Sequence, residues 1–280
     1  MKLVRFGEAG KEKPGVLDKD GHVRDLSAHL KDIAGDVLSD DSLKRISEID
    51  PATLPRMPDG VRLGAPVATP SKFVAIGLNY SDHAAEVGMP LPTEPIIFLK
   101  AVTSICGPND PTEKPRHSIK LDWEVELGIV IGKRAKYIEE AAAISHIAGY
   151  CLGNDVSERN FQLERQGQWT KGKSHDTFGP IGPWLVTREE ISDPHNLKMW
   201  LDVNGERQQT GTTATMIFKV PKIVSYVSHY MTLLPGDVIV TGTPPGVGSG
   251  KKPPRFLNVG DVVTLGVDGL GTQRQQIVAA

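Results

Sequence analysis

The chain has 280 residues, 39% of them hydrophobic and 24% charged, so it can bury a large core in one large domain or in one large and one small domain. Lys and Arg together number 32 against 34 Asp and Glu, a balance that argues against nucleic acid or an anionic membrane as a partner. The two cysteines have no metal or redox spacing, no signal-peptide region follows Met1, and no apolar stretch reaches the roughly 18 residues of a membrane span, so we expect a reducing, cytosolic setting.

The first fifty residues have the pattern of a small β-rich unit. Leu3–Phe6 fits a short strand, and Gly15–Arg24 fits a β-hairpin because a polar Asp-Lys-Asp-Gly turn separates two apolar segments. The polar stretch Leu26–Ile49 predicts two short helices. His22 and His29 have no partners nearby in the sequence, and we expect them at the surface rather than in a set of ligands.

Prolines are frequent after this unit and indicate a linker. We therefore expect a small N-terminal β-rich domain with its linker at residues 1–68 and a larger domain at residues 69–280. The prolines that mark the linker are Pro51, Pro55, Pro58, Pro66 and Pro70.

The larger domain opens with an apolar strand at Lys72–Gly77, followed by a short helical segment. Gly88 and Pro90 stop that helix after at most two turns, and so short a helix is marginal by itself. His83 and Glu86 lie three residues apart, on one helical face and within hydrogen-bond reach. The pair suits a base oriented by a carboxylate, and a surface His–Glu pair is the alternative.

Pro95–Lys100 is a further apolar strand, and the next strand, Asp122–Ile131, carries two acidic side chains. Glu124 and Glu126 share one face of it, about 7 Å apart along the strand. There they repel each other unless a proton or a positive group lies between them. The other face is apolar and predicted to meet the core, with Trp123, Val125, Leu127, Ile129 and Ile131.

A third carboxylate follows the apolar run Ile147–Gly153, since Asp155 would emerge at the end of that strand. Three carboxylates from two strands suit a hard divalent cation such as Mg2+, with positions left for water or substrate. The alternative for Glu124 and Glu126 is a solvated strand face.

Two polar segments come next. Ser157–Gln168 predicts a polar helix from which Arg159 and Gln162 could point toward the same carboxylates, and solvated positions are the alternative. In the loop Trp169–Pro180, one of the lysines could act as a fixed cation, and a charged loop is the alternative.

The last third of the chain predicts a hairpin at Lys198–Gln209 around Asn204-Gly205 and a strand at Val238–Val240 that meets a Gly-rich loop. That loop lacks the spacing and the hydroxyl residue of a phosphate-binding loop. Pro221 is expected at the first position of a helix, whose buried stripe would be Ile223, Val224, Val227, Tyr230 and Met231.

Together these motifs resemble the fumarylacetoacetate hydrolase superfamily, in the order of that family and over about residues 70–270. The N-terminal unit resembles the smaller domain often found there. Two further segments, Arg24–Ser27 and Leu270–Gln275, are most similar to bacterial members of the 2,4-didehydro-3-deoxy-L-rhamnonate or fuconate hydrolase type. The motifs are Gly77–His83, Asp122–Leu127, Gly153–Asp155, Arg159-x-x-Gln162, Gly172–Ser174, Asp176–Pro180 and Val240–Gly246.

The resemblance implies a fold that is mainly β with some α (α+β), namely a twisted mixed β-roll with a small N-terminal domain, and usually a homodimer. It implies Mg2+ or Mn2+ on Glu124, Glu126 and Asp155. Asn79 lies near the place of an aspartate that is a further metal ligand in the animal enzyme that names the family, so three carboxylates remain here.

The resemblance also implies roles around this metal. His83 and Glu86 would be the water-activating dyad, on a segment that closes over the ligand, and Lys173 would be the catalytic lysine. The positions that match substrate-binding residues are Tyr80, Arg159, Gln162 and Thr243.

The function we expect is a metal-dependent hydrolase that cleaves a C–C bond in a 2,4-dioxo acid, either an acylpyruvate or a deoxy-diketo sugar acid, and releases pyruvate. A lyase, isomerase or decarboxylase, including a ureidoglycolate lyase-like enzyme, could use the same site. A non-catalytic metal-binding protein is a remote alternative, because binding alone needs no dyad of His83 and Glu86 and no Lys173.

Overall fold

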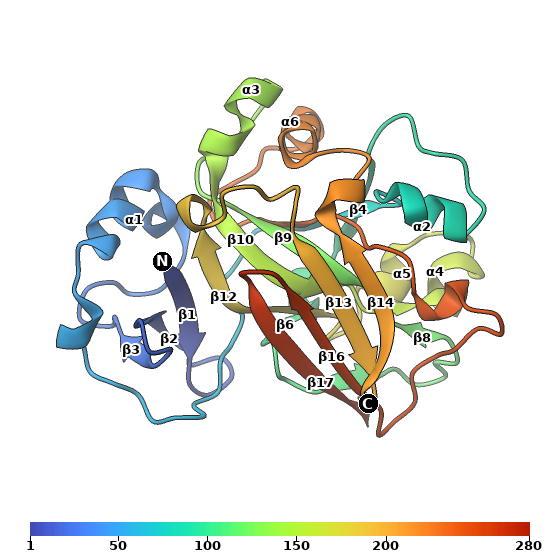
Figure 1. The fold of residues 1–280 in the computed structure, drawn as a ribbon, viewed down its shortest axis with the longest axis horizontal. Helices are drawn as coiled ribbons and strands as arrows, with labels where there is room; N and C mark the ends of the chain where they lie inside the picture. The colour runs from blue at the N-terminus through green and yellow to red at the C-terminus, as the bar shows by residue number, and fades with distance from the viewer.

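Two sheets make up most of the structure, a computed structural model that describes residues 1–280 (Figure 1). The larger is a ten-stranded mixed sheet in the order β3-β2-β1-β12-β10-β9-β15-β4-β5, with β6 paired to β12. The smaller has five strands in the order β14-β13-β16-β17-β7, and β11 and β8 form a separate pair. Helices are few and short, which confirms the expected mainly β fold with some α.

The elements run as follows. The strands are β1 Lys2–Phe6, β2 Lys13–Leu17, β3 Val23–Asp25, β4 Phe73–Gly77, β5 Ile96–Lys100, β6 Ile105–Cys106, β7 Thr112–Lys114, β8 Leu121–Asp122, β9 Val125–Ile131, β10 Ile147–Asn154, β11 Ser157–Glu158, β12 Gly179–Thr187, β13 Lys198–Val203, β14 Glu206–Thr212, β15 Val238–Val240, β16 Val262–Val267 and β17 Gly271–Ala279. The α-helices are α1 Asp40–Ser47, α2 Ser81–Glu86, α3 Glu140–Ala143, α4 Arg159–Leu163, α5 Thr170–Lys173 and α6 Val220–Tyr230.

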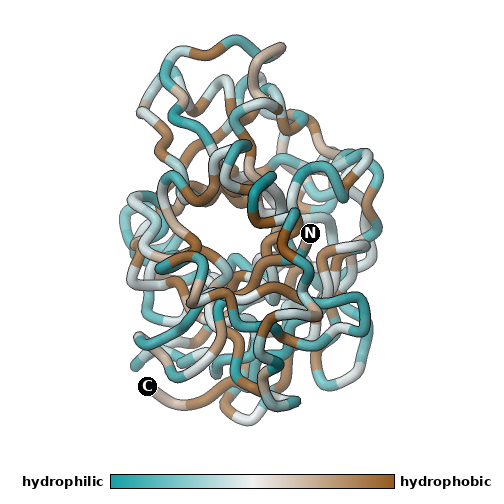
Figure 2. Tube along the Cα trace, turned by 90° about the vertical axis from the view of Figure 1, so that its left-hand side faces the viewer, coloured by the Kyte–Doolittle hydropathy of each residue, from teal (hydrophilic) through white to brown (hydrophobic).

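Each face of the central strand β9 meets a different core. Its alternate residues Val125, Leu127, Ile129 and Ile131 share one buried face, as the strand period of two predicts. They belong to a cluster of 34 buried residues that also includes side chains of the five-stranded sheet. Val130, on the opposite face, belongs to a second cluster of 19. Figure 2 shows hydrophobic segments through the middle of the molecule and hydrophilic ones along its outer loops.

The N-terminal unit continues the large sheet. Leu3 of β1 lies opposite Leu185 of β12, and the side chains of Leu3 and Val16 share the second cluster with Val130 and Val240. In Figure 1 this unit, in blue, lies at one end of the molecule, whereas α2, α4 and α5 lie at the other. The domain boundary near residue 68 stays a prediction.

Both predicted hairpins form. β2 pairs with β3 and β13 with β14, each antiparallel. Asn204 and Gly205 have φ values of 54° and 79°, as a type I′ turn requires.

The helix predicted at 157–168 was wrong at both ends. Ser157 and Glu158 pair with β8 instead, and the Glu158 carboxylate caps α4 by accepting from the backbone N–H of Phe161 at 2.8 Å. Gln166 and Gly167 have positive φ and end any helical continuation. Lys171 and Lys173 then lie in the separate helix α5.

Between Leu26 and Ile49 there are two short helices, as predicted: a 3-10 helix at Gly35–Leu38 and the α-helix α1. The predicted buried stripe of α6 needs correction at Tyr230, which is 64% exposed; its ring packs on that of Tyr226, at 4.9 Å between centroids.

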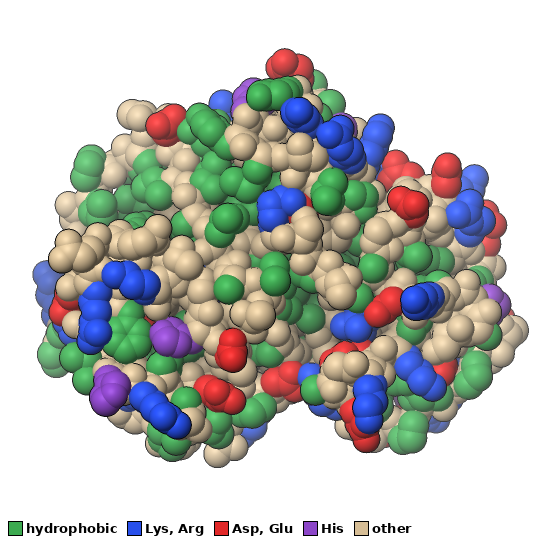
Figure 3. Space-filling model, turned by 180° about the vertical axis from the view of Figure 1, so that it is seen from behind, with side chains coloured by type: hydrophobic (Ala, Val, Ile, Leu, Met, Phe, Trp, Pro, Cys, Tyr) green, Lys and Arg blue, Asp and Glu red, His purple; other side chains and the backbone are tan.

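The surface seen from behind has hydrophobic side chains gathered in its upper left part, and charged ones lie at the margins and in the lower right part (Figure 3). None of the helices combines the length and the apolar character that crossing a membrane requires.

Candidate active site

The three predicted carboxylates meet at the centre of the large sheet. Glu126 lies opposite Gly153 in the register of β9 and β10, and the backbone N–H of Asp155 donates to the carbonyl oxygen of Glu124 at 2.9 Å. Strand pairing therefore joins residues that are about thirty apart in sequence. All three side chains are buried, and one ligand oxygen from each lies within 4.8 Å of the others.

Three buried cations bind these carboxylates, and two of them, Lys173 and Arg159, bind Glu124. Lys173 Nζ donates to Glu124 Oε2 at 2.8 Å and to Asp155 Oδ2 at 2.7 Å. Arg159 donates to the other oxygen of Glu124 at 2.7 Å and to Asp122 at 2.8 Å. Because Arg159 and Lys173 are both buried here, the alternatives of a solvated arginine and a charged loop do not hold.

The approach of α5 to α4 depends on a glycine. A Cβ at Gly172 would lie 2.5 Å from both the backbone nitrogen of Gln162 and the carbonyl oxygen of Glu158. Only a bare backbone allows this approach. It places Lys173 beside the carboxylates; within α4, Arg159 donates to the amide oxygen of Gln162 at 3.1 Å.

Glu126 differs from its two neighbours because it makes no ion pair. One oxygen accepts from the backbone N–H of Gly242 at 2.7 Å, and the other has no hydrogen bond within the protein. Burial raises the pKa of Glu126 well above its usual range, and the charges of Asp155 and Glu124 add to this effect. At Glu124 desolvation acts in the same direction, but Lys173 and Arg159 outweigh it and lower the pKa to about 2.

The donor set fits a hard divalent cation. Three carboxylates converge, and Glu126 has an oxygen without a partner. Oxygen ligands of this kind suit Mg2+ or Mn2+. The residues that could hold such an ion are Glu124, Glu126 and Asp155.

The predicted dyad forms across one face of α2. His83 Nδ1 lies 2.8 Å from Glu86 Oε2, and Glu86 Oε1 accepts from the backbone N–H of Gly246 at 2.8 Å. The bond at Nδ1 leaves Nε2 of the imidazole for a second partner. His83 is only 9% exposed, so the pair is not a solvated surface pair.

One cavity of about 200 Å3 connects these groups. The three carboxylates, His83 and Lys173 line it together with the predicted substrate-binding residues Arg159, Gln162 and Thr243. A larger hollow of about 570 Å3 lies beside α1 in the N-terminal unit, and no histidine or arginine lines it.

Two of the residues that match substrate-binding positions have protein partners. The hydroxyl of Thr243 donates to the carbonyl of Val125 and accepts from Gln209. Tyr80 does not line the cavity: it is fully buried in the larger core, and its hydroxyl lies 3.3 Å from Sδ of Met199.

Asn79 also has a structural place. Its amide donates to the carbonyls of Phe218 and Thr241, and its oxygen accepts from the backbone N–H of Phe218. All of its polar atoms are thus used in fixing the chain that enters α2, which agrees with three carboxylates rather than four.

Sequence reasoning gave no role to Lys100 or Asp122. Lys100, at the end of β5, is fully buried and donates to Asp155 and to the carbonyls of Val156 and Lys173. The available signal was its alternation with Ile96 and Phe98 on one strand face. Asp122 accepts from Arg159 and from the backbone N–H groups of Gly248 and Ser249.

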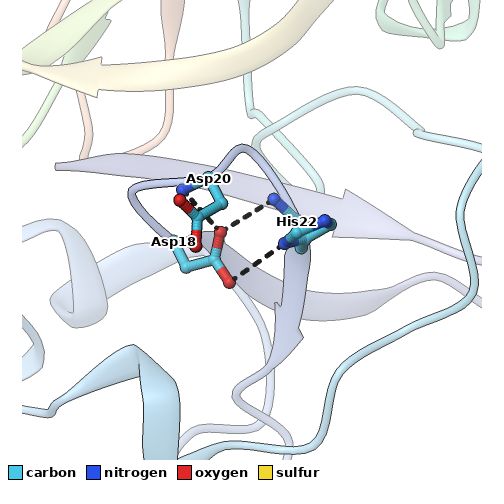
Figure 4. Close-up of side chains that lie close together, drawn as sticks. All are labelled: Asp18, Asp20 and His22. Atoms are coloured by element: carbon cyan, nitrogen blue, oxygen red, sulfur yellow. Dashed lines mark hydrogen bonds and ion pairs between the residues drawn. The ribbon is translucent and has the colours of Figure 1, made fainter.

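A second acidic group occurs in the turn between β2 and β3, where Asp18, Asp20 and His22 lie close together (Figure 4). The carboxylate of Asp18 accepts from the backbone N–H groups of Asp20 and His22 and from the side chain of Arg24. These bonds close a local turn, so the hairpin itself accounts for the group.

Known proteins match this chain over its whole length. The profile described as "Fumarylacetoacetate (FAA) hydrolase C-terminal" matches residues 72–278. A Burkholderia ambifaria protein whose name provisionally describes it as a hydrolase is 60% identical over 276 residues, 98% of each chain.

Two solved structures are also similar. The 5-carboxymethyl-2-hydroxymuconate delta-isomerase from Mycobacterium smegmatis is 36% identical, with a TM-score of 0.80 over 100% of this chain and 99% of that one. The maleylpyruvate hydrolase from Sphingobium sp. SYK-6, in complex with manganese(II) and pyruvate, is 29% identical, with a TM-score of 0.83 over 100% of both chains.

Proposed function

This chain belongs to the fumarylacetoacetate hydrolase family, and we propose that it is a divalent-metal-dependent hydrolase that cleaves a C–C bond of a small 2,4-dioxo acid and releases pyruvate. The observation that carries the proposal is one cavity lined by three converging carboxylates and an oriented histidine. The similarity to a maleylpyruvate hydrolase that was solved with manganese and pyruvate supports it.

His83 is the proposed general base. Glu86 holds Nδ1 of the imidazole, and the backbone N–H of Gly246 holds Glu86 in turn. The imidazole can therefore take a proton from water through Nε2. The resulting hydroxide adds to the C4 carbonyl, the C3–C4 bond breaks, and C3 gains a proton to give pyruvate and a carboxylic acid.

The buried cations are the proposed partners of the substrate's negative charge. Lys173 and Arg159 lie at the same end of the cavity as the carboxylates. Fixed positive groups in a buried site stabilise charge that develops in the transition state. Mg2+ or Mn2+, held by Glu124, Glu126 and Asp155, would supply Lewis-acid stabilisation of negative charge on the 2-oxo group.

An isomerase is the second candidate. The similarity to the 5-carboxymethyl-2-hydroxymuconate delta-isomerase favours it, since proton transfer on a dioxo acid could use the same cations and histidine. Hydrolysis needs an activated water, whereas isomerisation needs only proton transfer within the substrate. A lyase or a decarboxylase would likewise need no water at C4.

The test is a panel of acylpyruvates, deoxy-diketo sugar acids, oxaloacetate and hydroxymuconate-type acids, assayed with Mg2+ and Mn2+. We expect release of pyruvate and incorporation of one solvent oxygen, from 18O water, into the acid product. Isomerisation or decarboxylation without any cleavage on this panel would reject the hydrolase. Metal content of the purified protein, measured alongside, checks the cofactor.

The proposal extends to assembly and setting. β5 is an edge strand of the large sheet, and Leu99 on it is 42% exposed, which supports a homodimer. Sedimentation measures this directly. A cytosolic setting agrees with the two free cysteines, Cys106 and Cys151.

A further inference from the structure

We propose that the cavity selects 2,4-dioxo acids with an apolar acyl tail and discriminates against polyhydroxylated, sugar-derived tails. The inference rests on the proposed function for what occupies the charged part of the cavity. It concerns the hydrophobic side chains that line the rest of the cavity.

The cavity has two parts of different chemistry. Beside the charged groups its wall is hydrophobic, and nine residues contribute to it. They are Ile76, Leu78, Val87, Met89, Ile96, Phe98, Leu163, Trp169 and Val247. At the border of the two parts, Nζ of Lys173 lies 5.2 Å from the centroid of the Phe98 ring.

The strand β5 shows the change along its length. Ile96, Phe98 and Lys100 alternate onto one face of the strand. Ile96 and Phe98 line the hydrophobic wall, whereas Lys100 donates to Asp155 in the charged part. One strand therefore carries the cavity from an apolar part to a charged part.

The hydrophobic wall is a built feature. The ring of Trp169 meets that of Phe98 edge-on, at 5.2 Å between centroids. Trp169 also packs against the backbone of Gly77, where a Cβ would lie 2.6 Å from the ring. The indole thus occupies space that any side chain at residue 77 would fill.

Several apolar side chains of this wall remain exposed to solvent. Met89 is 53% exposed and Leu163 is 55% exposed, and both line the cavity. An apolar tail would cover part of these surfaces and so gain binding energy.

Few hydrogen-bonding groups are left for a hydroxylated tail. Besides the charged groups and His83, the polar side chains that line the cavity are Gln162, Thr243 and Ser249, and the indole N–H of Trp169 is one further donor. The hydroxyl of Thr243 is already bonded to Val125 and Gln209, and Ser249 is exposed at the rim. A tail hydroxyl against this wall would lose most of its water partners without replacement.

A matched substrate pair tests the inference. The acid 5-methyl-2,4-dioxohexanoate has an isopropyl tail, and in 5-hydroxy-2,4-dioxohexanoate a hydroxyl replaces one of its methyl groups at nearly the same size. We expect kcat/KM to favour the methyl compound by roughly 10–100-fold, the range a hydrophobic pocket achieves against a hydroxylated isostere. Equal values, or a preference for the hydroxyl compound, would overturn the inference and leave the proposed hydrolase standing.

A variant locates the preference. Leu163→Asn places an amide in the wall, and because Leu163 is more than half exposed, the fold should tolerate it. We expect this variant to reduce the preference for the methyl compound at least threefold. Leu234→Asn, at an exposed leucine outside the cavity, is the control and should leave the preference unchanged.

Binding separates this inference from the proposed function. Calorimetry with each compound in the presence of Mg2+ measures affinity whether or not cleavage follows. Tighter binding of the methyl compound without any cleavage would support the apolar wall and reject the hydrolase. Equal binding of the two compounds, or binding of neither, would overturn the inference.

Discussion

Two groups of acidic side chains in this molecule have the same number of potential ligands but different surroundings. In the β2–β3 turn, Asp18 receives its hydrogen bonds from residues two to six positions away. In the cavity, Glu124 and Asp155 receive theirs from residues 18 to 55 positions away. The first group is closed by its own turn, whereas the second exists only in the folded protein.

The difference shows which property marks a functional cluster. Proximity of carboxylates is common to both groups. Only the cavity group combines burial, cations from other elements and a carboxylate, Glu126, with a free oxygen. Five predictions use this contrast, from the largest expected effect to the smallest.

The largest effect is expected at Glu126. Glu126→Gln keeps the shape of the side chain but removes the negative charge from the carboxylate that has no ion pair. We expect divalent metal to be lost and activity to fall by more than about 100-fold, since even outer partners of a metal site cost 10–100-fold. Elemental analysis and steady-state assays measure both. Asp20→Asn in the hairpin is the control and should change neither; full activity of Glu126→Gln in chelator would contradict the metal site.

The second effect separates chemistry from metal binding. His83→Ala should slow cleavage of the dioxo acid by about 10²–10⁴-fold, the usual contribution of a general base. Metal affinity should stay close to that of the parent, because His83 bonds Glu86 and none of the three carboxylates proposed to hold the metal. Any oxaloacetate decarboxylation should suffer much less than cleavage. Equal losses of both activities would assign the dyad to substrate binding instead of water activation.

A smaller effect is expected at the buried lysine Lys100. Its ammonium joins Asp155 to the carbonyls of Val156 and Lys173, which needs three donors. Lys100→Met should lower kcat by about 10–100-fold, the range for groups that orient a metal ligand, and Lys100→Gln, with two donors, should lose less. Lys72→Met, at a lysine paired with buried Asp237 outside the cavity, provides the matched control. If Lys100→Met and Lys72→Met were equally active, Lys100 would not position the site.

The two groups should also respond oppositely to pH in metal-free protein. The pKa of Glu126 in the folded protein is raised above the ordinary 4.5. Between pH 4.5 and this raised pKa, only the folded state holds the proton. The free energy of unfolding therefore falls as pH rises through this window. Desolvation opposes the shift at Asp18, but hydrogen bonds from His22, Arg24 and Asp20 outweigh it and hold its folded pKa below the ordinary 3.8. Its contribution is therefore present above 3.8 and lost as pH falls further.

Urea unfolding in chelator at a series of pH values can separate these contributions. The difference in the free energy of unfolding between the parent and Glu126→Gln should grow above pH 4.5, because only the parent loses stability there. The difference between the parent and Asp18→Asn should shrink below pH 3.8. Parallel curves for parent and Glu126→Gln would show that Glu126 does not hold a proton in the folded state.

The smallest effect is expected in the hairpin. Asp18→Ala removes the acceptor for two backbone N–H groups and for Arg24, so the midpoint of thermal unfolding should drop by a few degrees. Activity and metal content should not change. A loss of activity at the assay temperature would mean that the N-terminal unit influences the cavity.

How far sequence reasoning reached depended on the range of the interactions. Glu124, Glu126 and Asp155 could be placed because strand alternation and strand ends are local patterns. The pairing of His83 with Glu86 follows from helical spacing. Lys100 was not placed: its alternation with Ile96 and Phe98 indicates the strand face on which it lies, but not its partner Asp155, 55 positions along the chain.

The errors have different origins. Ser157 and Glu158 have no local reason to leave the predicted helix, and their pairing with strand β8, a contact between distant segments, overrode the local preference. Tyr230 fits the helical period of Ile223 and Val227, but it lies at the end of α6 and is exposed.

The contact between Trp169 and the bare backbone of Gly77 has a consequence for how such an enzyme could diversify. Residue 77 sets how much room the indole leaves beside the substrate tail, yet it supplies none of the charged groups. A substitution at residue 77 would displace the indole and so change which tails the wall accommodates, while the charged groups would stay in place. Acceptance of new tails could thus arise by small steps at one wall, while the charged groups stay unchanged at each step.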